Sequence, residues 1–334
     1  MPNSNSDPHL SVCTLPAFSH PSCLNGSNTM KAIRYHAFGG PDELRIDEIP
    51  VPHAGPGEIR IAVHCAGVNP SDWKRREGQY QAFEDVVFPF TVGVEASGIV
   101  DEIGDGVSGV AIGDAVFGFG DGTVAEKAIL THWAAKPVAV SFEVAAGLPV
   151  IVDTASRALD EVNIETGQTL LVSGAAGGVG TAIVQLACLR GITVIGSASS
   201  PKHGYLGSLG AIATTYGPGL QERIAHLAPM GVDAAIDVAG SGVIPELISI
   251  VGNPARVLSV ADFSAEHYGA KFSHGPPEKP ELALAKIARL CADGLFRLHI
   301  EGVYPLHQTA DAHRVSAEGH VTGKLVIKIG CKIG

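Results

Sequence analysis

The chain has 334 residues, 46% hydrophobic and 17% charged, a composition that suits a globular protein large enough for two domains. Its formal net charge of −11 argues against nucleic acid or an anionic membrane as a partner, because both attract basic surfaces. Six cysteines form no CxxC pair, and no unbroken apolar stretch approaches the ~20 residues that cross a bilayer. We therefore expect a cytoplasmic protein with reduced thiols and no metal site.

The first 29 residues differ from the rest of the chain. They are rich in Ser, Asn and Pro, show no periodicity, and lack the basic start and apolar run of a secretory signal. Residues 1–29 are interpreted as a disordered tail or as sequence upstream of a true start at Met30.

Short β-strands are predicted from Met30 to about Ile129. The clearest alternation lies in residues 57–68, where Ile59, Ile61 and Val63 share one face. Single glycines that suit turns separate further predicted strands at Lys31–Phe38, Val92–Ile103 and Asp114–Phe119. This spacing predicts a compact, barrel-like β domain.

Helical patterns alternate with short apolar strands from about Ser141. The predicted strands are Thr169–Val172, Thr193–Gly196, Val232–Asp237 and Arg256–Val260. A helix between the first two carries an apolar face, and Gly191 is a natural stop for it. Repeated strand–helix–strand units predict a parallel sheet with helices on both faces.

After Pro276 the pattern changes again, to a helix at 281–293, a strand at 298–304, another helix and a final strand at 324–329. We expect this segment to return to the first domain. The predicted organisation is a substrate domain at 30–150, completed by 286–334, and a dinucleotide-binding domain at 151–285.

The most informative segment is the small-residue turn between the predicted strand ending at Val172 and the helix after it. Small residues let a backbone approach a diphosphate, and the free N–H groups at the helix start then hold the anion. The context of strand, turn and helix favours this interpretation over a tight turn without a ligand. The turn residues predicted to bind the cofactor are Gly174, Ala175, Ala176, Gly177, Gly178, Val179 and Gly180.

The segment after the second predicted strand indicates which dinucleotide binds. An NAD site usually places a carboxylate there, on the ribose hydroxyls. This chain has Ser197, Ser199, Ser200 and Lys202 instead, which would accept a 2′-phosphate that a carboxylate would repel. We therefore expect NADP(H), the alternative being that Lys202 is a solvated loop lysine.

Taken together, these residues resemble the zinc-free quinone oxidoreductase branch of the medium-chain dehydrogenase/reductase superfamily over nearly the whole chain from Met30. The segments that carry the resemblance are Ala66–Tyr80, Gly93–Gly98, Gly113–Phe119, Ser173–Gly180 and Gly319–Ile327. The resemblance implies an α/β fold, in which a Rossmann-type doubly wound parallel sheet is joined to a GroES-like β-barrel domain. It also implies a homodimer.

The zinc-dependent members of that superfamily have ligands that this chain lacks. Where they have a cysteine and a histidine, this chain has Asn69 and Val94, and Glu95 alone remains. One carboxylate cannot make a three-ligand zinc site. The structural-zinc lobe has no counterpart either, because residues 66–187 contain no cysteine.

Further contacts follow from the resemblance. Asn69 matches an asparagine near the nicotinamide and substrate, and Tyr80 a tyrosine proposed as a proton donor in enoyl thioester reductases. The matched cofactor contacts are Thr154, Tyr216, Val260 and Lys324.

Structural alternatives stand beside the catalytic ones. Asn69 could cap a turn before Pro70, and Tyr80 could be a rim aromatic. Asp72 is interpreted as the cap of a helix starting at Trp73, and Glu95 as a buried structural carboxylate. The basic run Lys74, Arg75 and Arg76 is interpreted as a solvated face, with the alternative that one of the three meets an anionic group of the substrate.

The function expected is NADPH-dependent reduction of a small electrophile, a quinone or an activated alkene, by direct hydride transfer. Two alternatives stay open. One is an enoyl thioester reductase, for which the sequence shows no basic patch for an acyl carrier. The other is an NADP(H)-binding redox sensor with little catalysis.

Overall fold

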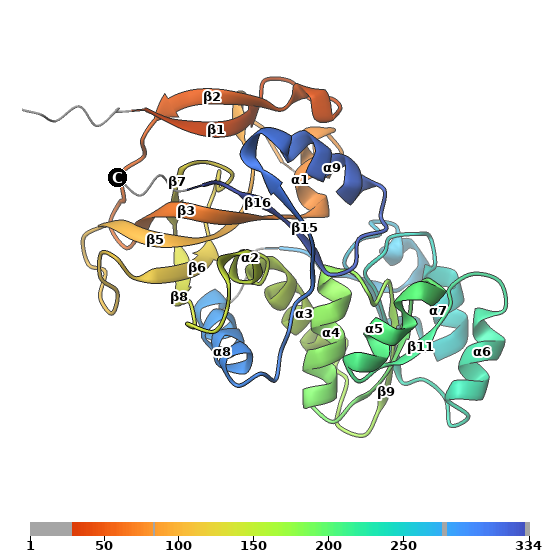
Figure 1. Ribbon diagram of the computed structural model, residues 1–334. Helices are drawn as coiled ribbons and strands as arrows, with labels where there is room; N and C mark the ends of the chain where they lie inside the picture. Colours follow the sequence, from red (N-terminus) through yellow and green to blue (C-terminus); the bar gives the residue numbers. More distant parts are fainter. Residues whose placement is uncertain (1–28, 83, 276–278, 331–334) are drawn as a thin grey trace, which may run out of the picture.

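A computed structural model describes residues 29–82, 84–275 and 279–330, and shows two joined bodies (Figure 1). Strands fill one body, and a sheet with helices on its faces forms the other. Long helices lie where the bodies meet. Over the described ranges, no helix is long and apolar enough to span a membrane.

The β-rich body contains two sheets. The smaller has the order β2–β1–β4, and the larger has the order β15–β16–β3–β5–β6–β8 with β7 also paired to β3. The predicted apolar face of β3 is confirmed, because Ile59, Ile61 and Val63 are all 0% exposed. The strands are β1 (Thr29–Tyr35), β2 (Arg45–Pro50), β3 (Ile59–Val68), β4 (Phe90–Thr91), β5 (Glu95–Ile103), β6 (Ala115–Phe119), β7 (Lys127–Leu130), β8 (His132–Ala135), β15 (Ile300–Pro305) and β16 (Lys324–Lys328).

The second body is built on a six-stranded parallel sheet of order β11–β10–β9–β12–β13–β14. Renumbered from β9, this order is 3-2-1-4-5-6, which confirms the predicted doubly wound Rossmann fold. Its central strand is covered on both faces, and Leu170, Leu171 and Val172 are 0% exposed. The strands are β9 (Thr169–Ser173), β10 (Thr193–Ser197), β11 (Ile212–Thr214), β12 (Ala234–Asp237), β13 (Val257–Ser259) and β14 (Lys271–Phe272).

Nine α-helices occur in the described residues. They are α1 (Pro70–Arg76), α2 (Phe142–Ala146), α3 (Pro149–Glu161), α4 (Gly178–Leu189), α5 (His203–Ser208), α6 (Leu220–Leu227), α7 (Ile244–Val251), α8 (Pro280–Ala292) and α9 (Thr309–Ala317). Short 3₁₀ turns lie at η1 (Pro41–Glu43), η2 (Ser200–Lys202), η3 (Pro254–Arg256), η4 (Ala265–Tyr268) and η5 (Leu306–Gln308). Helix α4 ends at Leu189, and Gly191 adopts a φ of 74°, as expected of a helix stop.

The last part of the chain returns to the β-rich body, as predicted. β16 pairs antiparallel with β3, and β15 pairs with β16. On the way, the Gly323 N–H donates to the Ala176 carbonyl at 2.8 Å, and Gly323 forms a bridge with Gly177. The returning segment therefore joins the barrel to the glycine-rich turn of the Rossmann sheet. The domain boundaries proposed from the sequence stay a prediction.

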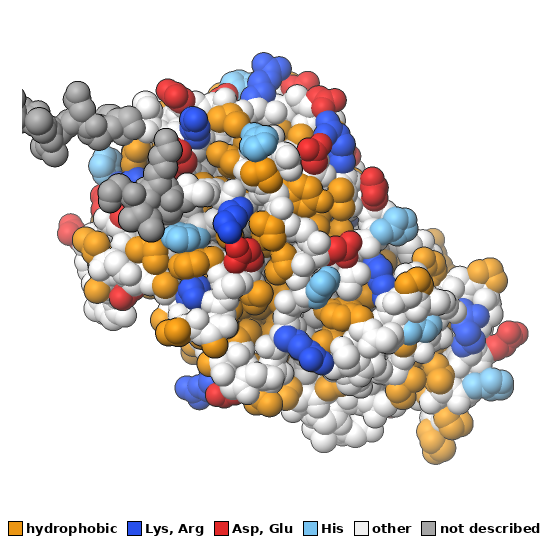
Figure 2. Space-filling model, in the orientation of Figure 1, with side chains coloured by type: hydrophobic (Ala, Val, Ile, Leu, Met, Phe, Trp, Pro, Cys, Tyr) orange, Lys and Arg blue, Asp and Glu red, His pale blue; other side chains and the backbone are white. Residues whose placement is uncertain are grey.

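Figure 2 shows one face of the molecule, on which acidic, basic and histidine side chains are interspersed among apolar ones.

Candidate active site

The glycine-rich turn lies where the sequence placed it, between β9 and α4. Gly174 adopts a φ of 78°, a left-handed conformation that favours glycine, and its carbonyl accepts the Gly177 N–H at 3.1 Å. Gly177 is the N-cap of α4, and Gly178 and Val179 form its first turn. The first N–H groups of a helix have no intrahelical partner, so this turn presents donors to an anion.

Gly180 lies inside helix α4, and the turn leaves no room for a larger residue at this position. A Cβ at this position would lie 2.5 Å from the Gly174 carbonyl oxygen and 2.6 Å from the Ala175 Cα. Neither atom can move without opening the turn, since both belong to the backbone. The turn also packs closely against β10, because a Cβ added at Gly196 would lie 2.7 Å from the Cβ of Ala175.

The residues proposed to select the cofactor lie at the carboxyl end of β10 and just beyond it. Ser197 ends that strand and is 2% exposed, and Ser199 is the N-cap of η2. The Lys202 ammonium donates to the His320 carbonyl at 2.6 Å. His320 belongs to the same returning segment whose Gly323 bonds the glycine-rich turn. Lys202 and the glycine-rich turn therefore both contact the segment that contains His320 and Gly323.

Tyr216 follows β11 and is 59% exposed. The loop that carries it is held by Arg223 of α6, which donates to the carbonyls of Thr215 at 2.9 Å and Pro218 at 2.8 Å. The Arg223 Nε is buried and has no partner among the described residues. This guanidinium therefore fixes the path of the loop beside the predicted 2′-phosphate position.

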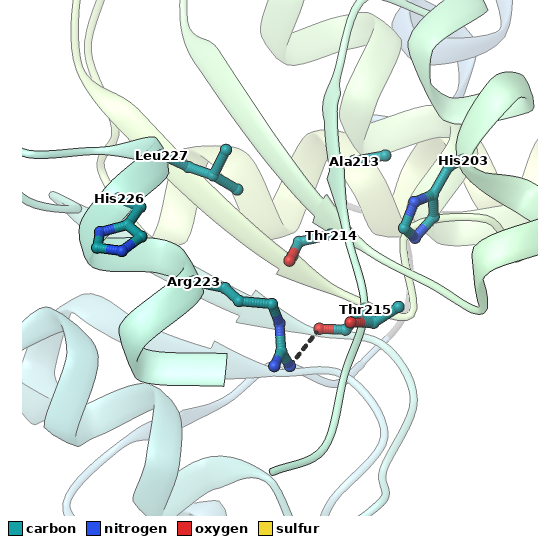
Figure 3. Close-up of a pocket in the computed structure, with 7 residues that line it drawn as sticks. All are labelled: His203, Ala213, Thr214, Thr215, Arg223, His226 and Leu227. Atoms are coloured by element: carbon teal, nitrogen blue, oxygen red, sulfur yellow. Dashed lines mark hydrogen bonds between the residues drawn. The ribbon is translucent and has the colours of Figure 1, made fainter. Parts of the chain in front are cut away.

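A cavity of about 340 Å³ opens at the end of β11 (Figure 3). Arg223 points across it to the Thr215 backbone, and His203 approaches from the opposite side. His203 follows Lys202 directly in the chain. The lining residues are His203, Ala213, Thr214, Thr215, Arg223, His226 and Leu227.

A buried polar cluster occupies the junction of the two bodies. The Lys324 ammonium lies 2.7 Å from Glu95 Oε1 and donates to Asn69 Oδ1 at 2.5 Å and to the Val68 carbonyl at 2.9 Å. The Asn69 amide donates to the same Glu95 oxygen at 2.8 Å. Glu95 is 0% exposed, and Asn69 and Lys324 are nearly so. The interpretation of Glu95 as a buried, hydrogen-bonded carboxylate is confirmed.

Glu95 also ties this cluster to α3. Its second oxygen accepts the Val150 N–H at 2.8 Å. Thr154 lies one helical turn further along α3 and is half-buried. A Cβ on Gly178 would lie 3.4 Å from Lys324 Cδ, so the stem of this lysine runs past the start of α4. Through these contacts, Glu95 and Lys324 connect Asn69, helix α3 with Thr154, and the glycine-rich turn.

Asp72 does not cap a helix that starts at Trp73, as the sequence suggested. Helix α1 begins at Pro70, Asn69 is its N-cap, and the Asp72 carboxylate accepts the Asn69 N–H at 2.8 Å. The side chain of Asn69 is engaged by Lys324 and Glu95 instead. Burial raises the pKa of Asp72 to about 6, against the opposing effects of the Asn69 N–H and Lys324.

The basic run in α1 is not a solvated face, and that prediction was wrong. Arg76 is 0% exposed and donates to His313 Nδ1 of α9 at 2.9 Å. Arg75 forms a bidentate pair with Glu84 at 2.6 and 3.0 Å. Burial lowers the pKa of Lys74, which lies within electrostatic reach of Asp237 and Asp262 of the Rossmann body. Three consecutive basic residues in a sequence do not show which of them form contacts with residues from distant segments of the chain.

Tyr80 is half-buried and lies at the junction of the two bodies. Its ring meets Phe263 edge-on, with centroids 5.9 Å apart. Burial raises the pKa of Tyr80, so its hydroxyl stays protonated at neutral pH. Val260 follows β13 three residues before Phe263, and its N–H donates to the Asp237 carbonyl at 3.0 Å. Tyr80 and the segment after β13 therefore face each other across the two bodies.

Two features of this region were not predicted from the sequence: the Glu95–Lys324 ion pair and the ring contact between Phe263 and Tyr80. Glu95 and Lys324 stand 229 positions apart (324 − 95), so no local pattern joins them. Phe263 sits in an irregular loop, where periodicity carries no signal.

Comparison with known proteins assigns the chain to a family. Residues 55–138 match the alcohol dehydrogenase GroES-like domain, and residues 218–327 match a domain described as zinc-binding dehydrogenase. A quinone oxidoreductase-like protein 2 of Mus musculus is 32% identical over 86% of this chain and 89% of its own length. The chain belongs to the medium-chain dehydrogenase/reductase superfamily, in its quinone oxidoreductase-like branch.

Other relatives agree with this assignment. A chloroplastic NADPH-dependent alkenal/one oxidoreductase of Arabidopsis thaliana is 30% identical over 89% of this chain and 79% of its own length. Quinone oxidoreductase of Rattus norvegicus is 37% identical, but over only 53% of this chain and 55% of its own length.

Solved structures share the whole fold. The quinone oxidoreductase of Coxiella burnetii has a TM-score of 0.79 and 29% identity, over 90% of this chain and 100% of its own. A mycobacterial relative solved with NADPH has a TM-score of 0.80 and 25% identity, with the same coverage. The fold is thus a Rossmann domain with a GroES-like domain, and the protein is an oxidoreductase of an NAD(P)H-binding family.

Proposed function

We propose that this protein reduces quinones or activated alkenes with NADPH by direct hydride transfer and without zinc. The observation that carries the proposal is the Lys324–Glu95 pair beside Asn69. It places a hydrogen-bonded ion pair, whose two charges compensate each other, where zinc-dependent relatives hold their metal ligands.

The residues at that place do not fit zinc. Glu95 is already neutralised by an ammonium 2.7 Å away, Asn69 contributes an amide, and Val94 is apolar. Zinc prefers thiolate, imidazole and carboxylate ligands, and here it would meet the charge of Lys324. In the described part of the chain, no group of three or more His, Cys, Asp or Glu side chains could hold a metal ion. The proposed hydride transfer therefore uses no metal ion.

The turn and the loops around it fit a dinucleotide with a 2′-phosphate. Gly174 and Gly180 keep the turn compact, so that a diphosphate could approach its backbone and the first N–H groups of α4 closely. Lys202 and Ser199 follow β10 without a carboxylate, which suits the extra phosphate. A relative named for NADPH and a related structure holding NADPH support this choice.

When bound, NADPH supplies a hydride, and the chain must align the acceptor and stabilise its charge. Lys324 and Glu95 fix the amide of Asn69 in one orientation, so that it loses no freedom when substrate binds. The protonated Tyr80 hydroxyl can donate a hydrogen bond to an oxygen on which negative charge develops. Tyr80 is thus our candidate proton donor.

A panel assay tests the proposal. The purified protein is mixed with NADPH and 1,4-benzoquinone, a 2-alkenal or crotonyl-CoA, and the reduced-nicotinamide absorbance is followed. Oxidation of NADPH by the first or second acceptor is expected, with slower use of NADH. Preference for crotonyl-CoA would favour the thioester reductase. Binding of NADPH without oxidation by any acceptor would favour the redox sensor.

A further inference from the structure

A row of stacked side chains crosses from the barrel to the Rossmann body. On the barrel side, the Arg75 guanidinium lies 5.8 Å from the ring centre of Phe90 and 5.9 Å from that of Tyr80. Tyr80 then meets Phe263 edge-on. The row spans β4, α1, the loop after α1 and the loop after β13.

The row continues along the carboxyl edge of the parallel sheet. The rings of Phe263 and Phe272 are 5.0 Å apart at 49°, and those of Phe272 and His274 are 5.4 Å apart at 24°. We call these six side chains the aromatic row: Phe90, Arg75, Tyr80, Phe263, Phe272 and His274. Spacings of 5 to 6 Å are those of favourable ring pairs.

The aromatic row runs beside the groups assigned to chemistry. Tyr80 lies within electrostatic reach of Asp72, which bonds the Asn69 backbone. Phe263 follows Val260 and Asp262 in the loop that faces Lys74 of α1. Ligands of open parallel sheets bind beyond the carboxyl ends of the strands, so the aromatic row lies on the side of the sheet where a substrate is expected.

We propose that Phe263 is a specificity-determining residue that selects planar ring acceptors, that is quinones, over open-chain alkenals. Phe263 keeps 42% of its surface exposed although both of its neighbours in the aromatic row contact it. A flat conjugated ring can stack on or meet the edge of such a phenyl group, whereas an aliphatic chain gains only apolar contact. This inference rests on the proposed function and names the acceptor class it prefers.

Binding without turnover separates this inference from the activity. With NADP⁺ in place of NADPH no hydride is available, so the Kd of 9,10-phenanthrenequinone and of trans-2-hexenal can be measured by calorimetry. The variants are Phe263→Leu, which removes the ring, and Phe263→Tyr, which restores one. Tyr268→Leu is the matched control, because Tyr268 is 50% exposed in the adjacent η4 and lies outside the aromatic row.

We expect F263L to weaken the quinone roughly 2- to 12-fold, the value of one aromatic pair, and the alkenal less than about 2-fold. F263Y should bind the quinone like the wild type, and Y268L should change neither Kd. Equal weakening of both ligands, an unchanged quinone Kd, or absence of quinone binding overturns the inference. Ring-dependent binding together with no NADPH oxidation would instead overturn the proposed function and leave the inference standing.

Discussion

Lys324 and Glu95 form an ion pair of 2.7 Å with side chains that are 4% and 0% exposed. The lysine begins β16, at the end of the chain, and the glutamate begins β5 of the barrel. Because Glu95 also accepts the Val150 N–H of α3, one carboxylate connects the returning strand, the barrel and the first long helix. Charges removed from water are costly unless paired, so each partner depends on the other.

The variant Lys324→Met tests this dependence. It keeps the length of the side chain but leaves the Glu95 carboxylate buried beside an apolar group, which should lower the free energy of unfolding by about 3–5 kcal/mol. Urea denaturation of K324M, E95Q and the double variant measures the coupling. The double variant should be destabilised by less than the sum of the single effects. Strict additivity would show that the two charges do not stabilise each other.

Asp72 should make the protein less stable as the pH rises. Its folded pKa of about 6 is above the model-peptide value of 3.8, so the native state keeps a proton that the unfolded chain loses. Stability is therefore lost between about pH 4 and pH 6, by up to about 3 kcal/mol. Asp72→Asn retains an acceptor for the Asn69 N–H and should remove the loss. Urea midpoints at pH 4.5 and 7 compare the two proteins, and a parallel pH response would contradict the assignment.

His313 acts in the opposite direction. Burial, with Arg76 beside it, lowers its pKa from 6.5 to about 3, so the unfolded chain binds a proton that the native state excludes. Stability is lost as the pH falls below about 6.5, by about 3 kcal/mol at pH 4.5. His313→Gln keeps an acceptor for Arg76 and should resist acid better than the wild type. Equal acid sensitivity of the two proteins in a denaturation series would sink this prediction.

The sequence alone predicted the features that depend on local pattern. Alternation located β3, and apolar runs between helices located β9, β10, β12 and β13 to within a few residues. Strand β2 was missed because its side chains are exposed or half-exposed, so no apolar face marks it. The turn before α4 was recognised because steric crowding there permits only small residues, which leaves a clear pattern in the sequence.

Long-range pairing is what the sequence could not show. Arg76 reaches a histidine 237 positions away, and nothing near Arg76 distinguishes it from a solvated arginine. The sequence could not decide whether Tyr80 lies at a rim or in the active site, because its neighbour Phe263 comes from the other body. Contacts of this kind depend on how distant segments pack together, within one body for Arg76 and between the two bodies for Tyr80.

Gly180→Ala tests the close approach inside the turn. The added Cβ would lie 2.5 Å from a backbone oxygen, so the turn must open, at a cost of about 1–3 kcal/mol of stability. NADPH affinity should fall at least about tenfold, because the N–H groups of α4 no longer face one point. Gly207→Ala in α5 is the control, since its Cβ meets nothing within 4 Å. Calorimetry showing equal NADPH affinity in both variants would contradict the role of Gly180.

Lys202→Met should change cofactor preference without changing the fold. The ammonium bonds the His320 carbonyl at 2.6 Å, an exposed contact whose loss should alter stability by less than about 1 kcal/mol. A charge-assisted bond to the 2′-phosphate is worth about 1.5–3 kcal/mol, so the KM for NADPH should rise roughly 10- to 150-fold. The KM for NADH, which lacks that phosphate, should stay within about twofold. If the KM values for both cofactors rose together, Lys202 would be acting through the loop around His320 and not through the phosphate.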